Sequence, residues 1–131
     1  MNSFNHYAIG AVGEWLYRVV LGINGDPARP GYAHVIVRPR PDGGLTWAKG
    51  SYHSIRGPIA VAWQQDGGAL SLDVTIPPNV TATIYVPAAA EDRVTEGGVR
   101  AATVAGVKFV RMQDGAAVFE VGAGRYQFVT R

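Results

Sequence analysis

The sequence predicts a mainly β protein, an antiparallel β-sandwich of the jelly-roll type with one N-terminal α-helix. Apolar and polar residues alternate over residues 57–87, and short apolar segments separated by turn residues continue to the end of the chain. A helical period occurs only before residue 23. Many short strands joined by turns rich in glycine and proline are typical of sandwiches and jelly rolls.

The clearest strands lie within residues 57–87. Three segments place apolar residues at every second position: 59–64, 70–76 and 80–86. This period gives a strand one face for a core and one face for water. A Gly-Gly pair follows the first segment, and Pro77-Pro78-Asn79 separates the second from the third. We expect the three segments to form an antiparallel meander whose apolar face is covered by a second layer.

The helix is predicted from residue 3 to about residue 22. Apolar residues recur there at steps of three or four positions, as in Ala8, Val12, Leu16 and Val19. Two prolines and no period mark residues 26–31 as a connector. The predicted division is therefore a terminal helix at residues 1–25 and a β-sandwich domain at residues 26–131.

The other strands flank the meander and bring the expected total to eight or nine. They are predicted at residues 32–38, 45–56, 99–104, 107–112, 117–121 and 126–130. Asp114-Gly115 between two apolar segments is a strong hairpin signal.

Composition excludes several classes of function. The 131 residues contain no cysteine, which excludes disulfides and cysteine zinc sites, and the net charge of +2 is too small for a nucleic-acid footprint. His6, His34 and His53 lack the spacing of metal ligands, so we expect no metal and no cofactor. No segment is long and apolar enough to cross a membrane, and no signal peptide is present, which favours the cytoplasm over secretion.

Residues that could carry catalysis are not grouped in the sequence. Most aspartates lie beside glycine or proline, where turn formation explains them, and Asp73 alternates outward on a strand. We therefore predict no catalytic residue. His6 is the one candidate for a ligand contact, because it lies in the polar and aromatic cluster Ser-Phe-Asn-His-Tyr at the start of the helix.

Exposed aromatic residues would be the second kind of candidate, because sugar rings stack on them. Trp47, Tyr52 and Tyr85 are the candidates for such a surface. Trp63 shares its face with Ile59 and Val61 and is expected in the core. In a regular strand Trp47 and Tyr52 have opposite parity and point to opposite faces.

Three parts of the sequence together resemble one family. They are the opening Ser-Phe-Asn-His-Tyr-Ala with Gly-Glu-Trp-Leu-Tyr after it, the block Gly-Leu-Thr-Trp-Ala through Ser-Ile-Arg-Gly-Pro-Ile to Trp63, and Ile-Pro-Pro-Asn through to Val86-Pro87. In order and spacing they are similar to the C-terminal end of bacterial α-L-rhamnosidases, glycoside hydrolase family 78. The likeness weakens after Pro87.

The resemblance implies that the residues up to about Gly22 correspond to the last helix of a catalytic α/α barrel, and the rest to a C-terminal β-sandwich. In that family an acid and a base in the barrel hydrolyse terminal α-L-rhamnose with inversion. Both carboxylates are missing from this chain, so we expect it to be inactive alone. His6 matches the histidine of the family's Asn-His-Tyr motif, which implies a substrate-binding role in the intact enzyme.

Three hypotheses follow. The first is a structural C-terminal domain whose partners are the catalytic barrel of the parent enzyme and, through the intact enzyme, rhamnose-containing glycosides. The second is a self-sufficient carbohydrate-binding module with an exposed aromatic row. The third is a homodimer formed through an exposed apolar helix.

Overall fold

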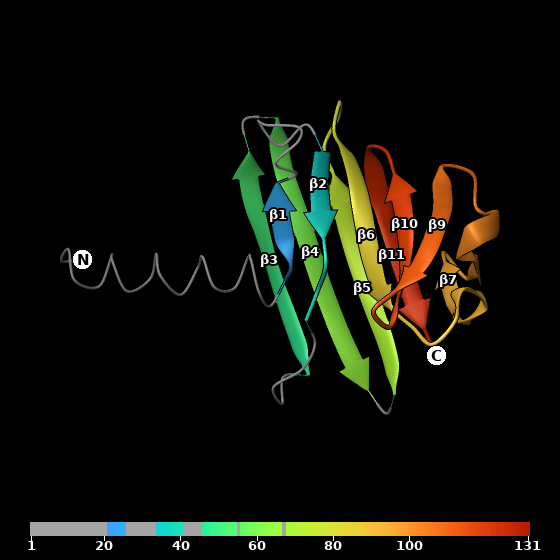
Figure 1. Ribbon diagram of the computed structural model, residues 1–131. Helices are drawn as coiled ribbons and strands as arrows, with labels where there is room; N and C mark the ends of the chain where they lie inside the picture. The colour runs from blue at the N-terminus through green and yellow to red at the C-terminus, as the bar shows by residue number, and fades with distance from the viewer. Residues whose placement is uncertain (1–20, 26–33, 41–45, 55, 67) are drawn as a thin grey trace.

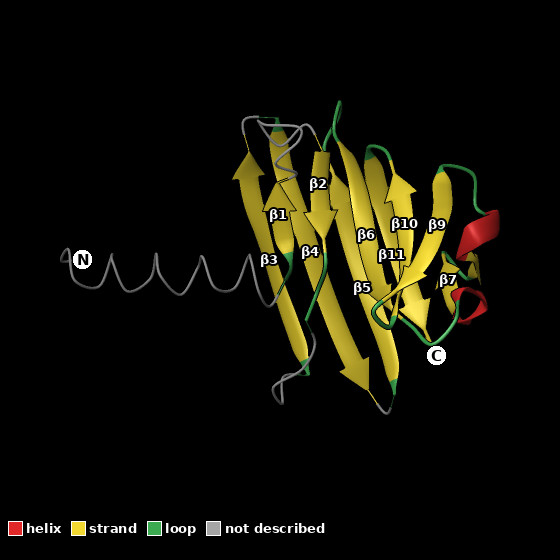
Figure 2. Ribbon diagram, viewed as in Figure 1, coloured by secondary structure: helices red, strands yellow, loops and turns green. Residues whose placement is uncertain are grey.

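The computed structural model describes residues 21–25, 34–40, 46–54, 56–66 and 68–131, and these residues form two packed β-sheets (Figures 1 and 2). The predicted antiparallel β-sandwich is confirmed. Among the described strands every pair is antiparallel except β2 and β6, which are parallel.

The two sheets differ in size. The five-stranded sheet has the order β1-β2-β6-β10-β9 and the six-stranded sheet has the order β3-β4-β5-β11-β7-β8. The strands of the first are β1 Ile23–Gly25, β2 His34–Val37, β6 Thr81–Pro87, β9 Val107–Gln113 and β10 Ala116–Val121. Those of the second are β3 Trp47–Ser54, β4 Gly57–Asp66, β5 Ala69–Ile76, β7 Val94–Glu96, β8 Val99–Arg100 and β11 Gly124–Thr130.

The core lies between the sheets and is built by the alternating residues. Strand β5 buries every second side chain, and β4 does the same at its centre. Trp63 is 2% exposed, so its predicted core position is confirmed. Phe119 from the five-stranded sheet stacks on Phe128 from the six-stranded sheet with 5.5 Å between ring centroids. Burying a large apolar side chain stabilises a fold by roughly 1.5–3 kcal/mol, so these rings are among its main supports.

The predicted meander is wrong in its third strand. Strands β3, β4 and β5 form the actual meander, whereas β6 crosses to the other sheet and pairs with β2 and β10. The link is the Pro77-Pro78-Asn79 segment, in which Asn79 takes a φ of 64° and the prolines have no N–H for a hairpin ladder. Alternation marks the buried face of a strand equally well in a hairpin and in a crossing between sheets.

Other differences concern short elements. The strand predicted at residues 99–104 is only β8, followed by the single-turn 3-10 helix η3 at Ala101–Thr103. A second such turn, η2, covers Glu91–Arg93, just before the three-residue β7. The described part of the chain contains no helix with the length and apolarity needed to span a bilayer.

The predicted N-terminal helix lies outside the described residues, apart from its last two positions, and stays a prediction. Leu21 and Gly22 are not helical, and Ile23–Gly25 pair with β2 as an edge strand. The division between residues 25 and 26 also stays a prediction, although these last residues of the first segment belong to the five-stranded sheet.

His34 joins the two parallel strands. Its ring is 7% exposed, with Nδ1 2.5 Å from the Thr81 hydroxyl and Nε2 2.8 Å from the Thr83 hydroxyl. Each hydroxyl donates or accepts, so either neutral tautomer of the ring satisfies both contacts. His34 is therefore a buried structural residue, which agrees with its expected place in a strand.

Gly22 holds the start of β1 against the end of β2. The Arg38 amide donates to the Gly22 carbonyl at 2.9 Å, and Gly22 has a φ of +72°. A Cβ at this position would lie 1.9 Å from the Arg38 carbonyl oxygen. Only glycine fits both the backbone conformation and this close approach.

We expect Gly22→Ala to lower the free energy of unfolding by about 3 kcal/mol, because backbone strain and the clash with Arg38 add together. Gly106→Ala is the matched control, since Gly106 also has a positive φ but nothing lies near its Cβ position. The control should cost about 1 kcal/mol. Urea unfolding followed by circular dichroism measures both, and equal losses would contradict the proposed close approach.

Candidate functional site

A hollow of about 770 Å³ lies on the outer face of the six-stranded sheet, at the end where β3 is the edge strand. We call it the edge trough and define it by Trp47, Lys49, Ala60, Ala62, Asp73 and Arg125. These residues come from β3, β4, β5 and β11, which are consecutive in the sheet.

The shape of the edge trough follows from side-chain size on a continuous sheet. Lys49 lies opposite Ala62, and Ala62 lies opposite Asp73. Neighbouring strands are about 4.8 Å apart, so the backbones at Lys49 and Asp73 are separated by roughly 10 Å. The methyl groups of Ala60 and Ala62 form a low floor between longer side chains on both sides.

The three aromatic candidates lie on three different surfaces, so the predicted aromatic row is wrong. Trp47 is 65% exposed on the outer face of the six-stranded sheet, whereas Tyr52 packs against the core. Regular pairing of β3 with β4 confirms their opposite parity. Tyr85 belongs to the other sheet and is only 9% exposed.

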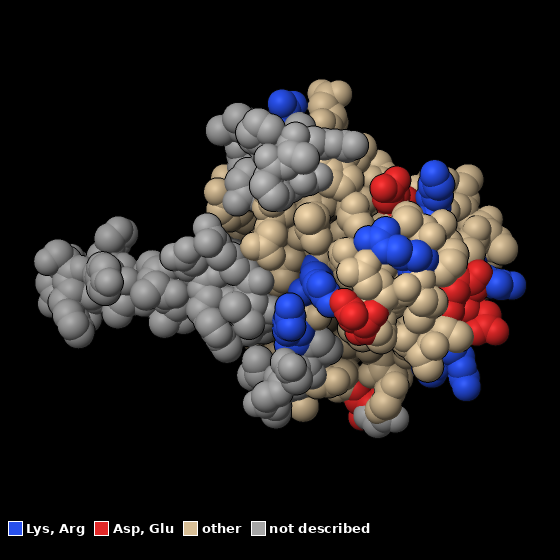
Figure 3. All heavy atoms as spheres, in the orientation of Figure 1, with Lys and Arg blue, Asp and Glu red and all other residues tan. Residues whose placement is uncertain are grey.

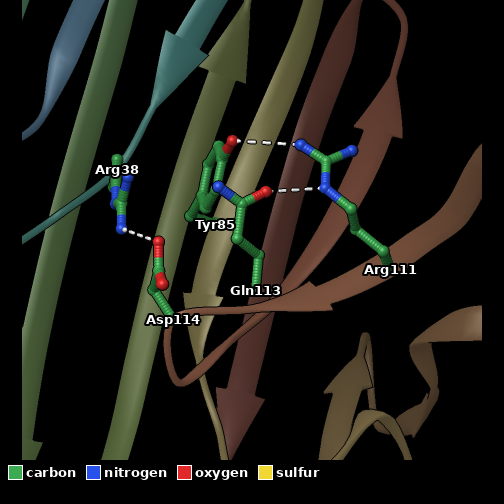
Figure 4. A network of polar contacts seen from close by, with 5 residues as sticks. All are labelled: Arg38, Tyr85, Arg111, Gln113 and Asp114. Atoms are coloured by element: carbon green, nitrogen blue, oxygen red, sulfur yellow. Dashed lines mark hydrogen bonds and ion pairs between the residues drawn. The ribbon is translucent and has the colours of Figure 1, made fainter.

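Tyr85 is the centre of a polar network on the outer face of the five-stranded sheet (Figure 4). Arg111 Nη2 donates to the Tyr85 hydroxyl at 3.4 Å, and Arg111 Nε donates to Gln113 Oε1 at 2.6 Å. The Arg38 guanidinium lies 4.8 Å from the centre of the Tyr85 ring and forms an ion pair with Asp114 at 3.3 Å. These side chains therefore satisfy one another.

The Tyr85 network covers a small apolar cluster on the same face. Tyr85, Ala116 and Val118 are buried there, and Ile36 packs against them. Figure 3, which views this side of the molecule, shows Lys and Arg interspersed with Asp and Glu, without a large area of one sign. The Tyr85 network itself is internally paired, and its arrangement explains why a tyrosine on the outer face is buried.

Two carboxylates of the described residues line one hollow. Asp73 and Glu96 both border a cavity of about 300 Å³ that adjoins the edge trough and shares Asp73 and Arg125 with it. Glu96 Oε2 accepts a hydrogen bond from the Gln127 amide at 3.1 Å. Glu96 is therefore engaged in a contact within the six-stranded sheet.

The histidines do not assemble a site within the described residues. His34 is structural, and His53 is exposed on β3. No group of three or more His, Cys, Asp or Glu side chains in the described ranges is arranged to hold a metal ion. His6 and the helix proposed for a homodimer lie outside these ranges, so both predictions stand as they were.

Comparison with known proteins identifies the family. Residues 22–101 match the model of the bacterial alpha-L-rhamnosidase C-terminal domain. The chain belongs to this family. The resemblance seen in the sequence is thereby confirmed, and the match includes the edge-trough residues Trp47, Lys49, Ala60, Ala62 and Asp73 but ends before Arg125.

The relatives of this rhamnosidase C-terminal domain are much longer than the chain. An alpha-L-rhamnosidase of Streptomyces avermitilis is 47% identical over 130 residues, which are 98% of this chain and 12% of that protein. A crystal structure of the Streptomyces avermitilis enzyme complexed with L-rhamnose superposes on the whole chain with a TM-score of 0.81 at 44% identity, again over 12% of its length. The alpha-L-rhamnosidase of Dictyoglumus thermophilum gives 0.79 at 31% identity, over 100% of this chain and 14% of that one.

Sequence reasoning did not single out the edge trough. It placed Asp73 correctly on the outward face of its strand but treated it as solvated, and it assigned no functional role to Ala60, Ala62 or Arg125. The sequence did contain one signal of the trough. Trp47 and Lys49 share the parity of one strand face, and the next strand carries two small residues, Ala60 and Ala62. Using it requires the pairing register, which alternation within single strands does not contain.

Tyr126 lies beside the hollow lined by Asp73 and Glu96. Its hydroxyl donates to the Gly122 carbonyl at 3.0 Å, and its ring stacks on Phe128 with 6.2 Å between centroids. Burial raises the pKa of the Tyr126 phenol above its ordinary value, and the negative charge of Glu96 raises it further. The folded chain therefore holds this proton more tightly than the unfolded chain.

This linkage predicts a loss of stability in alkali. The contribution of neutral Tyr126 is fully present below the unfolded pKa of about 10 and is lost as the pH rises through the higher folded pKa. Urea midpoints measured from about pH 9 to pH 11 should fall more steeply for the wild type than for Tyr126→Phe. Parallel pH profiles of the two proteins would contradict the assignment.

Proposed function

We propose that the chain is the C-terminal β-sandwich of an inverting α-L-rhamnosidase, where it supports the catalytic barrel and has no activity of its own. The observation that carries this proposal is the coverage of the alignment. It spans 98% of this chain but only 12% of the Streptomyces avermitilis protein. The catalytic machinery then belongs to the other part of the parent enzyme.

The described carboxylates support an inactive domain. Inversion needs an acid and a base about 6.5–9.5 Å apart, with one of them kept protonated by its surroundings. Glu91 is paired with Arg100 through two hydrogen bonds, and Asp114 is paired with Arg38. Glu96 is bonded to a backbone amide. These three carboxylates are therefore engaged in contacts within the domain.

The substrate class follows from the relatives. The Streptomyces avermitilis enzyme is described as an alpha-L-rhamnosidase and was crystallised with L-rhamnose. We therefore assign terminal α-L-rhamnosides of glycosides to the parent enzyme. In this scheme His6 contributes one sugar contact from the segment that precedes the sandwich.

The first test uses the chain and a hybrid enzyme. The purified chain should release nothing from an aryl α-L-rhamnoside. The chain placed in the Streptomyces avermitilis enzyme, in exchange for the matching 12%, should give a folded enzyme with near-normal turnover. A version that lacks the segment should be unstable or insoluble. Turnover by the chain alone, lost on changing one of its glutamates, would overturn the proposal.

The second test concerns His6 in the same hybrid enzyme. His6→Ala should lower kcat/KM for an aryl α-L-rhamnoside by about tenfold or more, because a hydrogen bond to the sugar is lost. The melting temperature should stay within about 2 °C, since a surface-pocket contact contributes little to folding. His53→Ala, an exposed histidine on β3, is the control and should change neither value. An equal kcat/KM for the two variants would remove His6 from the pocket.

A further inference from the structure

We infer that the edge trough is the surface on which the catalytic part of the parent enzyme docks, with Trp47 as its anchor. The inference rests on the proposed function and adds to it the face that makes the contact. The occupant is a protein surface of the same enzyme, with an apolar ridge over the trough floor and charged groups beside it.

The first argument is the exposure of Trp47. At 65% it is the most exposed large apolar side chain among the described residues. It lies at one end of the edge trough, opposite Gln64 and diagonal to Ala62, and its ring lines the same hollow as the alanine floor. Tryptophan anchors in such surroundings dominate the energetics of protein interfaces.

The second argument is charge. Within the described part of the chain, Lys49, Asp73 and Arg125 enter no ion pair and no side-chain hydrogen bond, although all three border the edge trough. By contrast, the charges around Tyr85 are satisfied within the domain. Two free cations and one free anion around an exposed indole fit a partner with carboxylates opposite the cations and a cation opposite Asp73.

The third argument is position. Strand β1 is an edge strand of the five-stranded sheet among the described strands. Strand β3, which carries Trp47, is an edge strand of the six-stranded sheet. Figure 1 shows both on one side of the molecule and β7 and β9 on the other side. The residues before β1 resemble the end of the catalytic barrel, and β1 is the first described strand after them.

The experiment compares exposed apolar residues at opposite edges of one sheet. Trp47 on β3 is 65% exposed and Val99 on β8 is 56% exposed. Trp47→Ala and Val99→Ala are made in the isolated chain and in the hybrid enzyme described above. Urea midpoints are measured for the isolated chains, and half-lives of rhamnosidase activity at elevated temperature for the hybrids.

We expect Trp47→Ala to shorten the half-life of the hybrid by roughly tenfold or more, as for loss of an interface anchor, and Val99→Ala to change it less than about twofold. Both isolated variants should keep the wild-type urea midpoint, because neither side chain is buried in the domain itself. Lys49→Glu should also shorten the half-life of the hybrid, since it reverses a charge that faces the partner.

Three results would overturn the inference. The first is equal half-lives for the Trp47→Ala and Val99→Ala hybrids when the unmodified hybrid is stable and active, which would leave the proposed function intact. The second is a Trp47→Ala variant that destabilises the isolated chain as much as the hybrid. The third combines two measurements: L-rhamnose shifts the NMR signal of the Trp47 indole in the isolated chain, and Trp47→Ala leaves the half-life of the hybrid unchanged. This result would indicate a sugar site. An unmodified hybrid without activity would reject the proposed function and this inference together.

Discussion

The fold depends on the burial of two apolar faces against each other, and the stacking of Phe119 on Phe128 joins those faces directly. Both rings are fully buried, and each comes from a different sheet. Neither sheet has a second apolar face of comparable size, so neither is expected to be stable in water alone. Once the inner faces are paired, function is left to the outer faces and to the edges. The outer face of the five-stranded sheet carries the Tyr85 network, whereas the outer face of the six-stranded sheet carries the edge trough.

The sequence predicted the strands and their buried faces well because a period of two reports directly which side chains point inward. Trp63 and Trp47 show this: the same residue type on neighbouring strands lies in the core in one case and in solvent in the other, as their parity requires. The pairing partners of the strands were harder to predict. Strand β6 alternates as clearly as β5, yet it joins the opposite sheet, because Pro77 and Pro78 permit a crossing as readily as a turn. Strands of two or three residues, such as β7 and β8, are too short to show a period at all.

The candidate site depends on information that no single segment holds. The edge trough arises where small residues of β4 lie between long side chains of β3 and β5, which is a property of register. Tyr85 was a candidate for an exposed aromatic surface, and it lies on the outer face of its sheet, but Arg38 and the apolar cluster from other strands bury it. His6 required the opposite kind of evidence. Its assignment came only from a family motif, because the pocket that it would line is built by other parts of the parent enzyme.

The charges of the Tyr85 network are paired within the domain, whereas those around the edge trough are not. In the isolated domain, leaving Lys49, Asp73 and Arg125 without partners costs little, because water solvates them. Docking removes part of that water, and an uncompensated charge at an interface costs several kcal/mol. A partner that covers Trp47 must therefore supply counter-charges at fixed positions, and this makes the contact selective as well as adhesive. The same contact would lie beside β3, which is an edge strand of the six-stranded sheet among the described strands. Docking at this edge thus accounts for the exposed indole and the unpaired charges together, which a solvent-facing role for the trough does not.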